Sequence, residues 1–287
     1  MPIAPERTRA VFSKLERDLV KLFTERHPES VHTFRTGTRR LQTLLEDLCS
    51  DRDRKRKKLL KMLARIRRRA GKVRDLDVQL AALRNLKAPQ EPRRKTQLMQ
   101  GLLDLRAEHD KRLRKALSKE TVREIRKRLK RAGRELNLAA ARDPLAVARQ
   151  LLDQAPRPVG SPSEVLLHQY RILTKRARYA AEFAAKSPEA DEFILQMRRM
   201  QDALGDWHDW LMLTQSATKR LGDSQHSPLI AVLRNVTGAK SRRAVAAVSV
   251  SAPAPTSPAG ARTPQPAGPR KRVGATSAAS ERGTSAA

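Results

Sequence analysis

The chain has 287 residues, with 61 Lys and Arg against 30 Asp and Glu, and a formal charge of +31. Self-repulsion at this charge opposes compaction, so the composition predicts a polyanionic partner. Aromatic residues make up only 3% of the chain, which argues against a platform that stacks single-stranded bases.

Apolar residues at helical spacing predict helices along most of the chain, and no stretch shows the alternation typical of a strand. Prolines and glycines separate these segments. The expected helices cover residues 6–25, 29 or 30 to about 49, 52–86, 93–118, 119–135, 144–154, 163–186, 189–221 and 227 to the mid-240s. From about Ser249 the composition changes to Ala, Pro, Ser, Thr and Gly, so residues 249–287 are expected to form a disordered tail.

One stretch occurs twice. Residues 31–46 (VHTFRTGTRRLQTLLE) match residues 167–182 (LHQYRILTKRARYAAE) at a spacing of 136. The identical pairs are His32/His168, Arg35/Arg171, Thr38/Thr174, Arg40/Arg176 and Glu46/Glu182. A second stretch repeats at a spacing of 134, with Gly71 over Gly205 and Asp75 over Asp209. Two repeated motifs in the same order indicate a duplicated unit.

Helical geometry places the basic residues of each repeat on one side. In the first copy His32, Arg35 and Arg39 lie opposite the apolar stripe of the same helix, and in the second copy His168, Arg171 and Lys175 do so. A solvated cationic face is the simplest interpretation of one such helix. The repetition favours a ligand-binding role, because solvation alone does not require His and Arg at matching positions.

On the basis of both repeated motifs, the chain resembles the CHAD family, the conserved-histidine α-helical domain, over roughly residues 5–245. The residues that carry the resemblance are His32, Arg35, Arg39, Arg40, Gly71, Arg74, Asp75, Asp77, His168, Arg171, Lys175, Arg176, Arg178, Tyr179, Gln201, Leu204, Gly205 and Asp209.

The resemblance implies an all-α fold of two four-helix bundles related by a pseudo-two-fold. We place this domain at residues 1–248, with halves at about 5–118 and 119–248. The resemblance also implies a basic surface that binds inorganic polyphosphate, association with polyphosphate granules, and no catalysis. The expected polyphosphate-binding residues are His32, Arg35, Arg39, Arg40, His168, Arg171, Lys175, Arg176 and Arg178.

Chemical alternatives for the histidines are weaker. A metal ion needs several ligands close together, whereas the His-x-x-Arg spacing supplies cations, so no metal or other cofactor is expected. A phosphoryl-accepting histidine is chemically possible, but the sequence has no nucleotide loop of P-loop type. In the sequence WHDW, residues 207–210, we expect Trp207 to be a core residue and Asp209, like Asp75, to pair with an arginine.

Two other classes of function stay open. A nucleic-acid-binding protein would use the same basic faces, although no zinc finger or recognition helix for base edges is present. A scaffold that recruits proteins is the third class, and the single-sign charge disfavours it. The lone Cys49 excludes an internal disulfide and favours a reducing compartment. No signal peptide or membrane span is expected, so we predict a cytoplasmic protein without membrane contact.

Overall fold

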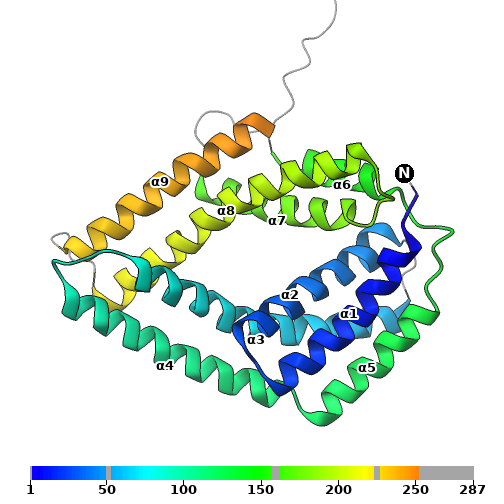
Figure 1. The fold of residues 1–287 in the computed structure, drawn as a ribbon, viewed down its shortest axis with the longest axis horizontal. Helices are drawn as coiled ribbons and strands as arrows, with labels where there is room; N and C mark the ends of the chain where they lie inside the picture. Colours follow the sequence, from blue (N-terminus) through cyan, green and yellow to red (C-terminus); the bar gives the residue numbers. More distant parts are fainter. Residues whose placement is uncertain (1, 50–52, 157–161, 223–226, 252–287) are drawn as a thin grey trace, which may run out of the picture. The chain divides into compact units, whose positions relative to one another are not determined.

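The computed structural model describes residues 2–49, 53–156, 162–222 and 227–251. Its helices are α1 (Pro5–Thr24), α2 (Pro28–Thr43), the π-helical turn η1 (Leu44–Leu48), α3 (Arg54–Asn85), α4 (Pro92–Ala116), α5 (Lys119–Arg134), α6 (Pro144–Asp153), α7 (Glu164–Ala181), α8 (Pro188–Leu221) and α9 (Pro228–Ser251) (Figure 1). In this part of the chain extended structure is limited to isolated bridges, so the expected all-α class is confirmed. Most of the predicted tail, residues 252–287, falls outside these residues.

Local chemistry explains where the helices begin. Proline is the first residue of six of the helices named above, because its fixed φ suits this position and its missing N–H costs nothing there. Serine side chains cap three helices, of which α8 also begins with proline. Ser118, Ser163 and Ser187 each accept a backbone N–H from the first turn of α5, α7 and α8. We expected α2 to begin at residue 29 or 30, after Pro28. This was wrong, because proline is favourable at the first helical position and Pro28 is the first residue of α2.

Packing between neighbouring helices occurs in the same order twice. Helix α1 packs on α2, α2 on α3 and α3 on α4, and likewise α6 packs on α7, α7 on α8 and α8 on α9. The two series meet where α2 contacts α7 and α3 contacts α8. Helix α5, which the predicted division assigns to the second half, packs against α1 and α3 of the first.

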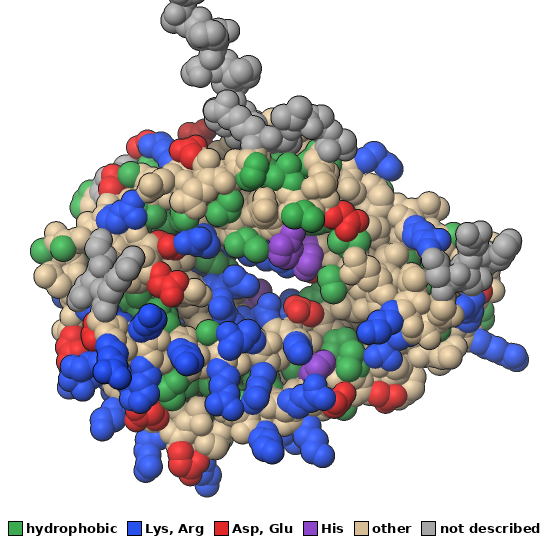
Figure 2. Space-filling view, turned by 180° about the vertical axis from the view of Figure 1, so that it is seen from behind, with side chains coloured by type: hydrophobic (Ala, Val, Ile, Leu, Met, Phe, Trp, Pro, Cys, Tyr) green, Lys and Arg blue, Asp and Glu red, His purple; other side chains and the backbone are tan. Residues whose placement is uncertain are grey.

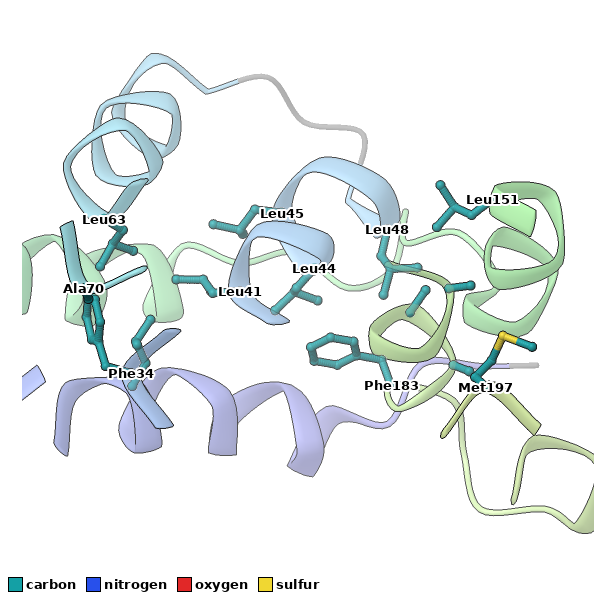
Figure 3. Packing of buried hydrophobic residues seen from close by; sticks show 14 of the residues in the cluster. Phe34, Leu41, Leu44, Leu45, Leu48, Leu63, Ala70, Leu151, Phe183 and Met197 are labelled. Atoms are coloured by element: carbon teal, nitrogen blue, oxygen red, sulfur yellow. The ribbon is translucent and has the colours of Figure 1, made fainter. Parts of the chain in front are cut away.

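Two clusters of buried hydrophobic residues stabilise these helices. The larger cluster joins α1, α2, η1, α5, α6 and α7 to parts of α3, α8 and α9. It includes Phe34, Leu41, Leu44 and Leu48, the predicted apolar stripe of the first repeat (Figure 3). The smaller cluster joins the C-terminal part of α3 to α4, α8 and the first turns of α9. The apolar sides of the motif helices are therefore buried, which leaves their basic sides free to face elsewhere.

Two helix ends differ from the expectation. Helix α7 ends at Ala181 rather than near Lys186. There the carbonyl of Phe183 accepts a hydrogen bond from the Ala4 N–H (2.8 Å), and the buried Phe183 ring joins the core. The apolar residues after Ala181 continue a helical pattern, so the sequence gives no sign of this tertiary contact. Helix α9 continues to Ser251, beyond the predicted start of the tail at residue 249.

Candidate functional site

A cavity of about 830 Å³, the central cavity, is lined mainly by residues of α2, α3, α7 and α8. Three carboxylates line it, those of Glu29, Asp75 and Asp209. Its twelve Lys and Arg residues are Lys14, Arg35, Arg39, Arg40, Arg67, Arg68, Lys72, Arg74, Arg171, Lys175, Arg178 and Arg198. Figure 2 shows Lys and Arg side chains gathered around a hollow, with His side chains beside it. The site thus has a large excess of positive charge.

The first repeat contributes Arg35 to the cavity wall. Its guanidinium lies against Gly71 of α3, where a Cβ atom would stand only 2.1 Å from Arg35 Nη1. Arg35 Nη2 lies 3.7 Å from a carboxylate oxygen of Asp75. Burial lowers the pKa of Arg35, and Asp75 opposes that shift. The close approach of Arg35 gives Gly71 a packing role, and the predicted arginine partner of Asp75 is confirmed.

The second repeat contributes Arg171 and Lys175, and these cations have less compensation. Burial lowers the pKa of Lys175 to about 7, and the positive charges of Arg171 and Arg39 add to the effect. Arg171 Nε is buried, and no acceptor in the described part of the chain reaches it. Asp209 acts on both cations at longer range, and burial raises the pKa of its carboxyl. Partly buried cations without a contacting anion are costly, so this wall favours occupancy by an anion.

The two repeated histidines lie in different surroundings. His32 lines the cavity, whereas His168 does not. The His168 ring lies 5.5 Å from the ring of His208, and His208 does line the cavity. Burial and the neighbouring Arg171 lower the pKa of His208 to about 3. The pKa values of His32 and His168 are also lowered, first by burial. Neutral imidazoles can each donate one hydrogen bond to a ligand without adding charge.

Arg40 and Arg176, which match in the repeat, both hold the halves together. Arg40 Nε donates to Glu182 at the end of α7 (2.7 Å), and Arg176 Nη2 donates to Asp47 in η1 (2.6 Å). Glu182 also contacts Arg178, whose guanidinium carbon lies 4.7 Å from the centre of the Tyr179 ring. Arg40 and Arg178 still line the central cavity, whereas Arg176 does not.

The central cavity does not resemble a metal centre or a catalytic triad. In the described ranges no group of three His, Cys, Asp or Glu side chains could hold a metal ion. Trp207 is buried in the core as expected. None of the helices that the structure describes is long and apolar enough to cross a membrane. What the arrangement can do is surround an extended, highly charged anion with guanidinium and ammonium groups.

The CHAD domain profile matches residues 6–218. The chain belongs to the CHAD domain family. The match begins in α1 and ends within α8, so α9 lies beyond it. By sequence, no curated protein matches the chain.

Two solved structures share the fold of this CHAD protein. The crystal structure of the CHAD domain from the plant Ricinus communis is 20% identical, with a TM-score of 0.60, and the match covers 86% of this chain and 92% of that one. PptA from Streptomyces chartreusis is 17% identical, with a TM-score of 0.60, and the match covers 86% and 96%. These similarities extend the assignment to the arrangement of the helices.

Within this CHAD domain the structure brings together most of the predicted site residues. Seven of the nine line the central cavity, and the exceptions are His168 and Arg176. Sequence reasoning missed several cations of α3, among them Arg67, whose pKa is lowered to about 10 by burial and by Arg39 and Arg35. A signal for them existed, because Arg67 and Arg74 lie four before and three after Gly71, on the same side of one helix.

Proposed function

We propose that this CHAD domain binds inorganic polyphosphate in the central cavity, with Arg35, Arg39, Arg171 and Lys175 as its principal contacts. The observation that carries the proposal is the uncompensated charge of the cavity wall. Twelve Lys and Arg line it against three carboxylates, and the pKa of Lys175 is lowered to about 7 by burial and by the neighbouring cations Arg171 and Arg39. A chain of phosphates supplies negative charge along its whole length, and arginine recognises phosphate oxygens through paired donors.

Membership of the CHAD family supports polyphosphate as the anion, since binding of this polymer is a property of the family. The cavity also favours a thin polyanion. Its contacts come from side chains on four helices that face inward, whereas duplex DNA carries its phosphates on the outside of a wide rod. Nucleic acid is therefore the weaker, non-specific ligand in this proposal, held by exposed basic faces through counterion release.

The proposal includes three further expectations. The two helix series form bundles related by an approximate two-fold axis, so that each half supplies one wall of the cavity. Binding occurs without catalysis. In the cell the protein associates with polyphosphate granules, because a protein of this charge and ligand class would concentrate where the polymer is stored.

A competition titration tests the ligand class. Fluorescently labelled protein is titrated with long-chain polyphosphate and with duplex DNA, at equal phosphate concentration and at several salt concentrations. We expect micromolar or tighter binding of polyphosphate and several-fold weaker binding of DNA, with both affinities falling as salt rises. Equal affinities would reduce the protein to a generic basic binder and contradict the proposal.

A further inference from the structure

A second basic depression lies beside the central cavity. This α3–α4 groove has a volume of about 530 Å³, and each of its lining residues is Lys, Arg or His: Arg65, Arg68, Arg69, Lys72, His109 and Arg112. The four residues of α3 follow one another at steps of three, one and three, so they share one side of the helix. His109 and Arg112 lie three apart on α4, which packs against α3.

Few anions within the protein compensate this groove. Arg112 contacts Glu108 of its own helix, and Arg69 Nη1 donates to the backbone carbonyl of Arg112 at 3.5 Å. Among the described residues, no carboxylate forms an ion pair with Arg65, Arg68 or Lys72. The side chains of Arg65, Arg68 and Lys72 are exposed.

The basic helix α5 provides a contrast within the same protein. There Arg126 pairs with Glu16, Arg128 with Glu124 and Arg131 with Glu135. High charge alone therefore does not leave every arginine of a basic helix in this chain unpaired. In the α3–α4 groove, Arg112 alone among the five Lys and Arg forms an ion pair with a carboxylate of the described residues. A bound anion would supply the missing charge.

The groove and the central cavity adjoin, because they share part of their lining. Arg68 and Lys72 line both of them. We infer that a polyphosphate chain long enough to leave the central cavity crosses α3 at Arg68 and Lys72 and continues in the α3–α4 groove. From Arg65 to Lys72 the groove follows about 10 Å of helix. The inference rests on the proposed function of the cavity, and it assigns the groove to longer chains of the same ligand.

Ligand length separates the groove from the cavity in an experiment. Tripolyphosphate is short enough to be held by the cavity alone, whereas a long chain would contact both surfaces. We expect Arg65→Gln with Arg69→Gln to weaken binding of long-chain polyphosphate by about fivefold, as two phosphate contacts are lost, and to reduce the salt dependence. Tripolyphosphate affinity should change less than about twofold, because these residues lie outside the cavity.

A matched control removes the same charge from the same helix. Lys57 and Lys58 are exposed on α3 and line neither the groove nor the cavity. Lys57→Gln with Lys58→Gln should leave long-chain affinity within about twofold of the wild type. Arg69→Gln removes the hydrogen bond to the Arg112 carbonyl and could disturb the fold. A second groove variant, Arg65→Gln with Arg112→Gln, keeps Arg69 and its bond to that backbone carbonyl.

Two results would overturn the inference itself, and a third would refute the proposed function on which it rests. Equal losses of long-chain binding in the groove and control variants would show a general charge effect. Weaker binding of duplex DNA with unchanged polyphosphate binding would assign the groove to nucleic acid. Tripolyphosphate binding that is unaffected by Arg39→Ala with Lys175→Ala would instead refute the proposed function of the cavity, so the two failures are distinguishable.

Discussion

The guanidinium of Arg35 occupies the space that a side chain at residue 71 would need: a Cβ there would lie 2.1 Å from Arg35 Nη1. Gly205 occupies the matching position of the second copy, and a Cβ atom there would meet nothing within 4 Å. The two repeated glycines therefore have different roles. Gly71 gives an arginine access to the helix backbone, whereas the space around Gly205 is open.

Alanine at each glycine makes a matched pair of variants. Gly205→Ala should raise the free energy of unfolding by up to about 1 kcal/mol, because glycine is costly inside a helix. Gly71→Ala should give less of this gain and should weaken polyphosphate binding several-fold, because the Arg35 guanidinium must move. Thermal melts and titrations of both variants measure this, and equal affinities would show that the position of Arg35 does not matter for binding.

Charge removal from each repeat tests the principal contacts. Arg35→Ala with Arg39→Ala, and separately Arg171→Ala with Lys175→Ala, should each weaken polyphosphate binding at least tenfold, since a charge-assisted bond is worth roughly 1.5–3 kcal/mol. Asp75 should tolerate the loss of Arg35, because 62% of its side chain is exposed. Melting temperatures should therefore fall little in the first variant, and a large fall with affinity retained would make these residues structural.

The buried ammonium of Lys175 should reduce stability when no ligand is bound. The folded-state pKa of Lys175 is about 7, against an ordinary value of 10.5, so the unfolded chain binds more protons between these values. The destabilisation by this group is then full below pH 7 and is relieved as pH rises toward 10.5. Lys175→Met should raise the melting temperature at neutral pH, and its advantage over the wild type should shrink at higher pH.

Polyphosphate should reverse that advantage. A bound polyanion favours the charged form of Lys175, so saturating polyphosphate should stabilise the wild type more than Lys175→Met. Thermal melts of both proteins at several pH values, with and without polyphosphate, measure both effects. A variant that melts below the wild type without ligand would show that the ammonium is already well compensated.

Arg176 allows the structural arginines to be separated from the binding ones. Its partner Asp47 has a side chain that is only 11% exposed, whereas Arg176 itself is 41% exposed. Arg176→Ala leaves a largely buried carboxylate without its partner, and we expect a loss of about 1–2 kcal/mol in unfolding free energy. Polyphosphate affinity, measured well below the melting temperature, should stay within about twofold of the wild type. Strongly weakened binding would return Arg176 to the ligand site.

The repeat, the helical period and the family resemblance were sufficient to predict most of the helices and six of the twelve Lys and Arg that line the cavity. Phe34 and Leu41 mark the buried side of α2, so Arg35 and Arg39 had to lie on another side whatever the tertiary structure. The same reasoning could not separate Arg40 from Arg35, since both lie off the apolar stripe. Only the approach of α7 to α2 places Glu182 next to Arg40.

The missed residues depend on contacts between helices that a single-helix pattern does not contain. Arg67 is one of eleven Lys and Arg in residues 52–69. Its spacing from Gly71 places it on the same side of α3 as that glycine, but its position near Arg35 and Arg39 depends on the packing of α2 on α3. The early end of α7 has a similar cause, because Phe183 leaves the helix to meet the N-terminal residues of the chain.

The π-helical turn η1 affects how the two halves of this sequence should be compared. A π turn accommodates one residue more than an α turn, and here it does so while Leu44 and Leu48 stay buried. At the constant spacing of 136, Asp47 is aligned with Phe183. The contacts instead match Asp47 with Glu182, because Asp47 accepts a hydrogen bond from Arg176 as Glu182 does from Arg40. The spacing of the repeat then drops to 134 in the next motif. An alignment of the two halves that pairs Asp47 with Glu182 therefore needs a shift of one residue at η1, where the chain is still helical.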